Sequence, residues 1–175
     1  MSIVFLIGMP ASGKSYWGEK VAHKNNLPFI DLDNYIEEQE KTTISALFSI
    51  FGEDVFREKE NKYLKEIILN FKNKKLLLAC GGGSPCFYDN IELMNRVGTV
   101  IYLKINLATI IINISKEDNK SKRPFLQNIV SLESFFENQL QKRKYFYEQA
   151  KYIVEVEKMT LGSLGKLVNL CINHL

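Results

Sequence analysis

The sequence has few of the side chains on which many metal and redox sites depend. Only two histidines occur among 175 residues, at His23 and His174, which argues against a catalytic histidine or a histidine metal site. The three cysteines are an odd number and form no C-x-x-C pair, which argues against a disulfide framework and a zinc site. Such cysteine usage is typical of a reducing compartment, so we expect a cytoplasmic protein.

Long apolar runs and a strong excess of one charge are also missing. No apolar stretch reaches the roughly 18 to 20 residues that span a bilayer, and residues 3–7 lead into a glycine loop instead of a cleavage site. We therefore expect no membrane segment and no signal peptide. The net charge of +3, with acids and bases interspersed, argues against nucleic acid as a partner. The length fits a single domain, residues 1–175, which we expect to be monomeric.

Short apolar runs alternate with helical patterns along the whole chain. The runs predict buried strands at residues 3–7, 28–30, 75–79, 99–103 and 152–156. Between and after them, helices are predicted at residues 15–25, 34–51, 53–71, from about 108, at 132–150 and at the end of the chain. Strands that alternate with helices predict an α/β fold, a parallel sheet with helices on both faces.

Glycines and carboxylates gather where the predicted strands end. Gly8 follows the first strand, Asp31 and Asp33 follow the second, and the run Gly81 to Gly83 follows the third. Ligands of parallel α/β sheets bind beyond the carboxyl ends of the strands. These residues therefore predict a ligand site along one edge of the sheet.

The strongest motif is Gly-Met-Pro-Ala-Ser-Gly-Lys-Ser at residues 8–15, which matches G-x-x-x-x-G-K-[ST] between a strand and a helix. Glycines let the backbone curl so that successive N–H groups face an anion, and the helix dipole adds positive potential. Lys14 is expected to reach the β- and γ-phosphates of ATP, and Ser15 to offer its hydroxyl to Mg²⁺. The alternative, a chance glycine turn, is disfavoured by motif and context together.

The Asp31-Leu32-Asp33 segment admits two interpretations. In an extended strand, alternation places both carboxylates on one side, where one can serve magnesium through water and the other can orient a substrate hydroxyl. Alternatively, Asp33 caps a helix that begins at Asn34. The residues alone favour neither interpretation.

Two further patterns point to a bound anion. Arg57 and Glu60 are three residues apart on a predicted helix, so Glu60 can hold the guanidinium while it binds a ligand carboxylate. For an isolated pair, a surface ion pair is the better interpretation. The triplet Gly81 to Gly83 favours function, because three residues without Cβ allow a ligand to approach the backbone closely.

In their order along the chain, six motifs resemble those of the shikimate kinase family, and the resemblance covers nearly the whole sequence. Six ordered matches are far more specific than the glycine-rich loop, which alone identifies only a nucleotide-binding superfamily. The matches are residues 8–15, Asp31 with Asp33, Phe56-Arg57 with Glu60, Gly81 to Gly83, Arg123-Pro124, and Arg143 with Tyr147.

The resemblance implies a three-layer α/β/α P-loop kinase fold with a five-stranded parallel sheet in the order 2-3-1-4-5. The implied reaction is ATP-dependent phosphorylation of the 3-hydroxyl of shikimate to shikimate 3-phosphate, in the chorismate pathway to aromatic amino acids. Mg²⁺ is the implied cofactor, and ATP and shikimate are the implied partners. Substrate-binding helices are expected at about residues 34–71, and a mobile lid at about residues 115–128.

The resemblance also implies a role for each matched residue. Asp33, as the base, together with Lys14 and Arg123 would be catalytic, and Ser15 and Asp31 would serve the metal. Shikimate would be bound by Asp33, by a carboxylate clamp of Arg57 and Arg143, and by Gly81, Gly82 and Gly83. The nucleotide would be bound by Gly8, Ala11, Ser12, Gly13, Lys14, Ser15, Tyr16 and Arg123.

The chain also departs from the family pattern. An arginine often stacks on adenine shortly before the lid, but residues 110–113 are Ile-Ile-Ile-Asn, and Cys80 stands where threonine or serine is common. Two alternatives are another small-molecule or nucleoside-monophosphate kinase and a non-catalytic ATP-binding regulator. The paired aspartates and the glycine triplet argue against the first, and the presence of Asp33 and Arg123 argues against the second.

Overall fold

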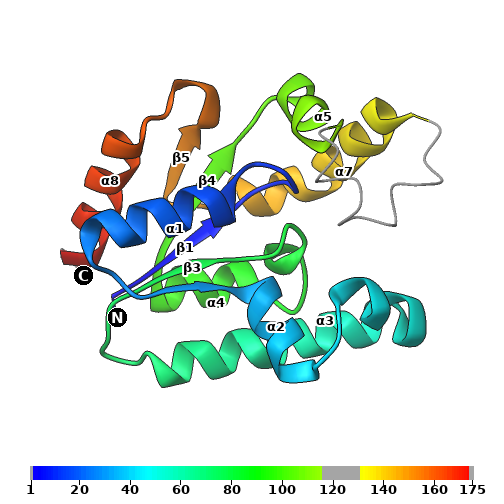
Figure 1. Ribbon diagram of the computed structural model, residues 1–175, viewed down its shortest axis with the longest axis horizontal. Coiled ribbons are helices and arrows are strands. Elements are labelled where there is room, and N and C mark those ends of the chain that lie inside the picture. Colours follow the sequence, from blue (N-terminus) through cyan, green and yellow to red (C-terminus); the bar gives the residue numbers. More distant parts are fainter. Residues whose placement is uncertain (1, 116–130, 174–175) are drawn as a thin grey trace.

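The structure is a computed structural model that describes residues 2–115 and 131–173. One parallel sheet forms its centre, in the order β2-β3-β1-β4-β5 (Figure 1), which confirms the expected fold class and strand order. The strands are β1 (Ile3–Ile7), β2 (Phe29–Asp31), β3 (Leu76–Ala79), β4 (Gly98–Lys104) and β5 (Tyr152–Glu155). The α-helices are α1 (Lys14–Asn25), α2 (Leu32–Glu40), α3 (Ile44–Asn70), α4 (Asn90–Val97), α5 (Leu107–Ser115), α7 (Leu132–Tyr147) and α8 (Leu161–Asn173).

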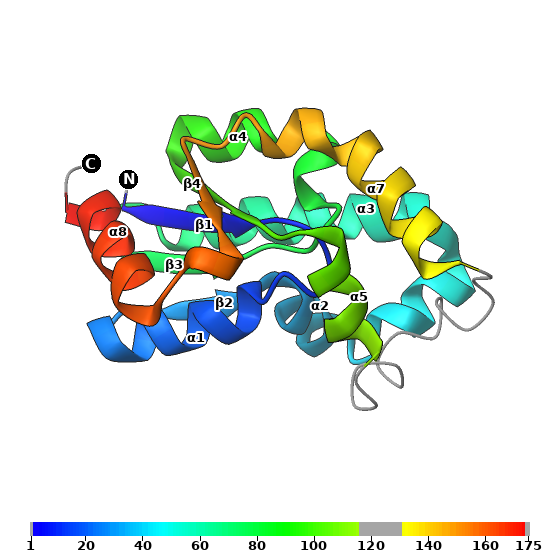
Figure 2. The same cartoon turned by 90° about the horizontal axis from the view of Figure 1, so that it is seen from above.

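Two apolar clusters, one on each face of the sheet, make up the core. Every residue of β1 is fully buried, and side chains alternate between the faces, so odd and even positions enter different clusters. Ile3, Phe5 and Ile7 pack toward α2, α3, α4 and α7, whereas Val4 and Leu6 pack toward α1 and α8. The result is three layers, with the sheet between two groups of helices (Figure 2).

The register of the sheet brings the predicted strand ends to one edge. Leu6 of β1 pairs with Ala79 of β3, and Ala79 pairs in turn with Asp31 of β2. The glycine-rich loop after β1, the carboxylates after β2 and the glycine triplet after β3 therefore start at neighbouring points. This is the edge at which the sequence predicted a ligand site.

The helices between β2 and β3 differ from the sequence prediction of 34–51 and 53–71. α2 begins earlier, at Leu32, and ends at Glu40, and the next residue, Lys41, takes up a left-handed conformation with φ 56°. α3 begins after Thr43, whose hydroxyl accepts a hydrogen bond from the Ala46 amide at 3.2 Å. The predicted break near Gly52 is a kink inside α3, where φ is 81°.

Two elements between β3 and β4 were not predicted. A short 3-10 turn, η1 (Ser84–Cys86), follows the glycine triplet, and α4 follows that turn. After β5, a second 3-10 turn, η3 (Val156–Lys158), leads to α8. Among the described residues, no helix combines the length and the apolar character that a membrane crossing requires.

Candidate active site

The loop after β1 has the backbone that an anion nest requires. Gly8 has φ 147°, and a Cβ there would lie 2.6 Å from the Leu103 carbonyl oxygen of β4, so the position is closed to other residues. Gly13, at the start of α1, and Ala11 are left-handed, with φ 85° and 63°. The curled loop places the first amides of α1 toward the carboxyl edge of the sheet.

Lys14 spans this loop from the first turn of α1. Its side chain is buried, and its Nζ donates to the carbonyl oxygens of Gly8 at 3.0 Å and Met9 at 2.9 Å. These contacts hold the ammonium over the curled loop of residues 8–15, which is called the phosphate cradle below. The Tyr16 side chain behaves differently, because it is exposed and its hydroxyl accepts a hydrogen bond from Lys20 at 2.7 Å. What Tyr16 can offer an anion is its backbone N–H in the first turn of the helix.

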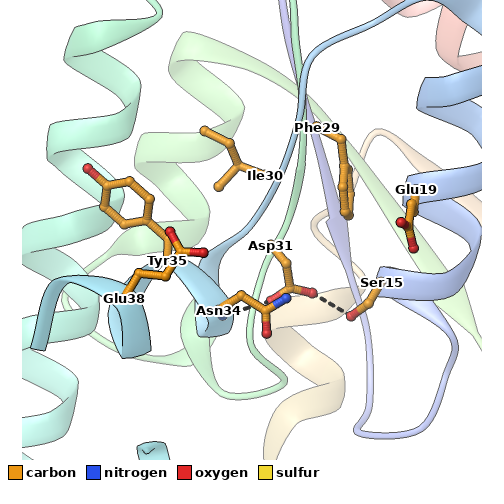
Figure 3. A pocket seen from close by; sticks show the side chains of 8 residues that line it. All are labelled: Ser15, Glu19, Phe29, Ile30, Asp31, Asn34, Tyr35 and Glu38. Atoms are coloured by element: carbon orange, nitrogen blue, oxygen red, sulfur yellow. Dashed lines mark hydrogen bonds between the residues drawn. The ribbon is translucent and has the colours of Figure 1, made fainter. Parts of the chain in front are cut away.

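Ser15 and Asp31 provide oxygen atoms beside the loop. They point toward one another in a cleft of about 310 Å³ between α1 and α2, and the Ser15 hydroxyl donates to the Asp31 carboxylate (Figure 3). Hydroxyl and carboxylate oxygens are ligands that Mg²⁺ prefers. Within the described residues, no group of three or more histidines, cysteines and acids could hold a metal.

Asp31, not Asp33, caps α2. The Asp31 side chain accepts hydrogen bonds from the amides of Asp33 at 3.0 Å and Asn34 at 3.3 Å. The prediction that Asp33 caps the helix is therefore wrong. The prediction of an extended segment with both carboxylates on one side is also wrong, because α2 begins at Leu32. Asp33 lies in the first turn of α2, and its carboxylate lies beside Gly81, which follows β3.

The Asp33 carboxylate lies among charged groups from three elements. Burial, and next the negative charges of Asp31 and Glu60, raise its pKa from its ordinary value of 3.8 to about 7, although Lys14 and Arg57 oppose the rise. A carboxylate with a pKa near neutrality is suited to accept a proton at physiological pH.

Arg57 and Glu60 form the predicted ion pair, and the pair is buried, not exposed on the surface. Arg57 Nη1 lies 2.6 Å from Glu60 Oε2, and Nη2 lies 3.2 Å from Glu53 Oε1. Burial alone would lower the pKa of Arg57, but the two carboxylates raise it, so the guanidinium stays charged. Its central carbon also lies 5.0 Å and 4.6 Å from the ring centroids of Phe56 and Phe87. An arginine held on three sides presents its remaining donors in a fixed direction.

Other side chains of the protein occupy the space that Cβ atoms on the glycine triplet after β3 would need. A Cβ on Gly81 would lie 2.7 Å from both Asp33 Oδ1 and Glu60 Oε1. On Gly82 it would lie 2.8 Å from a ring carbon of Pro10 in the glycine-rich loop. The triplet therefore packs against α2, α3 and the loop after β1.

Gly83 is closed by Arg57 in the same way, since a Cβ there would lie 2.6 Å from the guanidinium carbon. The absence of three side chains is thus what allows the predicted site residues to converge.

Arg143 enters the site from α7. The buried Tyr147 hydroxyl, one turn further on, donates to the Gly82 carbonyl oxygen at 2.5 Å and so ties α7 to the glycine triplet. Burial raises the pKa of the Cys86 thiol to about 11, and the charges of Arg143 and Arg57 both oppose that rise. The two arginines of the predicted clamp therefore approach the same side chain, from α7 and α3.

Some of the predicted functional residues lie in a part of the chain that the structure does not describe. Residues 116–130 lie outside the described residues, and they include Arg123 and all but the first residue of the predicted lid at about residues 115–128. The sequence patterns did not point to Ser84, Cys86 or Phe87, which follow the glycine triplet and contact or face the Arg57–Glu60 pair. Their place directly after three glycines at a strand end was the available signal.

Comparison with known proteins decides the family. The profile described as shikimate kinase matches residues 10–168, most of the chain. The chain belongs to the shikimate kinase family. A shikimate kinase of Azobacteroides pseudotrichonymphae is 38% identical over 169 residues, covering 94% of this chain and 95% of that relative.

The chain is similar to solved shikimate kinases in fold as well as in sequence. The crystal structure from Bacteroides thetaiotaomicron has a TM-score of 0.87 at 37% identity, covering 96% of this chain and 98% of that one. The structure from Acinetobacter baumannii in complex with shikimate has a TM-score of 0.85 at 28% identity, covering 98% and 93%. The likeness to shikimate kinases therefore extends over the P-loop, the glycine triplet and α7.

Proposed function

We propose that this chain transfers the γ-phosphoryl group of ATP to the 3-hydroxyl of shikimate, giving shikimate 3-phosphate and ADP. One observation supports it above the others: the Asp33 carboxylate lies where the phosphate loop meets the buried Arg57–Glu60 pair. A hydroxyl acceptor that carries its own carboxylate matches this arrangement of one base and separate cations. Family membership supports the same reaction.

Asp33 acts on the acceptor. Its carboxylate accepts the proton of the attacking hydroxyl, and a pKa of about 7 leaves a large share of it ionised at neutral pH. Lys14 and the amides of the loop stabilise charge on the transferred phosphoryl group. Phosphoryl transfer depends mostly on such positioning and electrostatic stabilisation.

Ser15 and Asp31 are the residues that would hold Mg²⁺, because their oxygens face each other beside the cradle. When bound, the ion supplies positive charge that neutralises the β- and γ-phosphates. Asp31 is fixed for this task by the two α2 amides that it caps.

Arg57 and Arg143 bind the shikimate carboxylate. A second negative charge near the phosphates would be repelled without cations of its own, and these two arginines lie away from the phosphate cradle on α3 and α7. The three glycines between them line the acceptor side. Arg123, from the segment at about residues 115–128, is proposed to close over the nucleotide as part of a lid in a single kinase domain. The three free cysteines support placing the reaction in the cytoplasm.

A coupled assay for ADP release tests the acceptor. Shikimate is expected to support turnover, whereas gluconate and nucleoside monophosphates should give only the background ATP hydrolysis. Quinate is a useful near-analogue because it keeps the carboxylate and ring hydroxyls. Turnover with gluconate or a nucleotide, and none with shikimate, would overturn the proposal. Binding of ATP without turnover of any acceptor would favour the alternative of a non-catalytic ATP-binding regulator.

The division of roles predicts different kinetics for three variants. Asp33→Asn should lower kcat by about 100-fold or more with little change in the KM for shikimate, because it removes an interaction made in the transition state. Arg57→Ala and Arg143→Ala should raise that KM by about tenfold or more, as loss of ground-state binding does. Arg96→Ala, on the exposed face of α4, is the matched control. Equal effects of all three on kcat and KM would contradict the division.

A further inference from the structure

The first half of the phosphate cradle contains a turn that its sequence does not favour. In the four residues from Met9 to Ser12, the Ser12 amide donates to the Met9 carbonyl oxygen at 3.1 Å. The second residue is Pro10, and the third, Ala11, has φ 63°. These are the features of a type II turn, in which the third position is normally glycine. The Cβ of Ala11 therefore places strain in this turn.

The same turn sets the position of Lys14. The Met9 carbonyl oxygen that accepts from the Ser12 amide also accepts from Lys14 Nζ at 2.9 Å. If the turn relaxed, this carbonyl would rotate and the ammonium would lose one of the loop carbonyls that hold it. A carbonyl rotated into the cradle would also repel phosphate oxygens, because an anion nest needs N–H groups on its inner side. Binding of phosphate therefore requires the strained turn.

Asn113 of α5 contacts the turn at its strained residue. The Asn113 side-chain Nδ2 donates to the Ala11 carbonyl oxygen at 3.1 Å, across 102 positions of sequence. The Ala11 carbonyl and the Ser12 amide belong to one peptide unit, so this unit is held at both ends, by Asn113 and by Met9. A donor on this carbonyl favours the orientation of the peptide unit that the type II turn requires.

Asn113 is an unusual residue for its place in the helix. The segment reads Ile-Ile-Ile-Asn-Ile at residues 110–114, and Ile110 and Ile114 are fully buried. Asparagine is a poor helix former, because its side chain competes for backbone groups. Asn113 also ends the stretch 110–113 that lacks the arginine of the family pattern. A polar residue whose amide holds the phosphate cradle fits a role in nucleotide binding better than a role in packing.

We propose that Asn113 is a positioning residue for the nucleotide, because its side-chain amide holds the strained turn at Ala11 in the conformation that binds phosphate. The proposal rests on the proposed function, since it takes residues 8–15 as the ATP-phosphate site. Without the amide, part of the population has a relaxed turn, and the apparent Kd of the nucleotide rises by the inverse of the competent fraction. Bound nucleotide restores the turn, so the rate at saturation is retained.

Asn113→Ala tests this role, and alanine preserves the helix because it is the best helix former. The Kd of a non-hydrolysable ATP analogue with Mg²⁺, measured by isothermal titration calorimetry, should rise about tenfold, because one hydrogen bond is lost and the strain at Ala11 is no longer offset. The KM for ATP should rise by a similar factor, while kcat and the KM for shikimate stay within about twofold. An unchanged Kd would overturn the proposal.

Asn106→Ala is the matched control on the same helix. Asn106 Oδ1 accepts from the Thr109 amide at 2.8 Å and so caps α5 at the end away from Asn113. Loss of this cap should lower the thermal midpoint, while the Kd of the ATP analogue stays within about twofold. If Asn106→Ala raised that Kd as much as Asn113→Ala does, Asn113 would act only through the stability of α5, and the proposal would fall.

A double-mutant cycle with Ala11→Gly separates the strained turn from other effects of the amide. Glycine adopts a positive φ without a steric penalty, so the turn should depend much less on Asn113. In the Ala11→Gly background, Asn113→Ala should raise the Kd of the ATP analogue by only about twofold or less. An equal rise in both backgrounds would show that the amide does not act through the conformation of Ala11.

The binding assay contains no acceptor, so the two proposals can fail separately. The expected rise in Kd, in a chain whose unmutated form does not phosphorylate shikimate, would overturn the proposed function and support the role of Asn113. Turnover of shikimate together with a Kd that Asn113→Ala leaves unchanged would do the reverse. An unmutated chain that does not bind the ATP analogue would overturn both.

Discussion

Lys14 shows how one side chain can matter for catalysis and little for folding. Its ammonium donates to carbonyls of its own loop and belongs to neither apolar cluster. Lys14→Met keeps the apolar stem, so we expect kcat/KM to fall by about 100-fold or more while the thermal midpoint moves by only about 3 °C or less. Activity assays and thermal melts check this. Lys20→Met, exposed on the same helix, is the control, and full activity in Lys14→Met would refute the cradle assignment.

Asp33 should make stability depend on pH in a particular direction. Its pKa is about 7 in the folded chain against an ordinary value of 3.8, so between these values the folded state holds a proton that the unfolded state has lost. The free energy of unfolding therefore falls as pH rises through that window and then levels off. Asp33→Asn removes this penalty.

We expect the stability advantage of Asp33→Asn over the unmutated chain to be absent near pH 4 and to reach the order of a few kcal/mol above about pH 7. Denaturant melts at a series of pH values measure it. A difference that stays constant with pH would show that the Asp33 carboxyl is not perturbed in the folded state.

At the scale of residues, the sequence predicted which side chains pair better than it predicted their burial and local geometry. The spacing of Arg57 and Glu60 was enough to pair them, because residues three apart share a helix face. It could not show that the pair is buried, since burial depends on Phe87 and the glycine triplet, which come from later in the chain. Asp31 and Asp33 were both identified, yet which of them caps α2 depended on where that helix starts.

At the scale of elements, the glycine triplet offers a sharp test. Gly83→Ala places a Cβ against the Arg57 guanidinium, so the arginine must move and the KM for shikimate should rise by about tenfold. Gly162→Ala, in the first turn of α8, is the matched control, since a Cβ there would have Thr160 Oγ1 as its neighbour at 3.8 Å, an ordinary contact. Steady-state kinetics compare the two. An unchanged KM in Gly83→Ala would mean that Arg57 does not hold the acceptor.

Strands were easier to predict than the helices around them. A strand buried on both faces, such as β1, is a continuous apolar run with few competing interpretations. The boundary between α2 and α3 was missed because it depends on Lys41 in a left-handed conformation, which few sequence signals announce. α4 was missed because its buried apolar positions, Ile91 and Met94, are too few to show a clear period.

At the scale of the whole molecule, the two substrates should stabilise the fold through separate residues. A non-hydrolysable ATP analogue with Mg²⁺, and shikimate, each at about 100 times its Kd, should each raise the thermal midpoint by about 5 to 10 °C. At the same ligand concentrations, Arg57→Ala should lose about half or more of the shift caused by shikimate and keep the one caused by the nucleotide, and Lys14→Met should do the reverse. Loss of both shifts in either variant would contradict two separate subsites.

The bond from the Tyr147 hydroxyl to the Gly82 carbonyl oxygen joins residues 65 positions apart. Translation delivers the phosphate loop and the carboxylates near residue 31 first, the glycine triplet next, and α7 much later. A nascent chain can form strand pairs as it leaves the ribosome. The contact between α7 and the glycine triplet, however, can form only after most of the protein has been synthesised. A ribosome stalled before residue 147 would therefore carry a phosphate cradle whose acceptor side still lacks the contact between α7 and the glycine triplet.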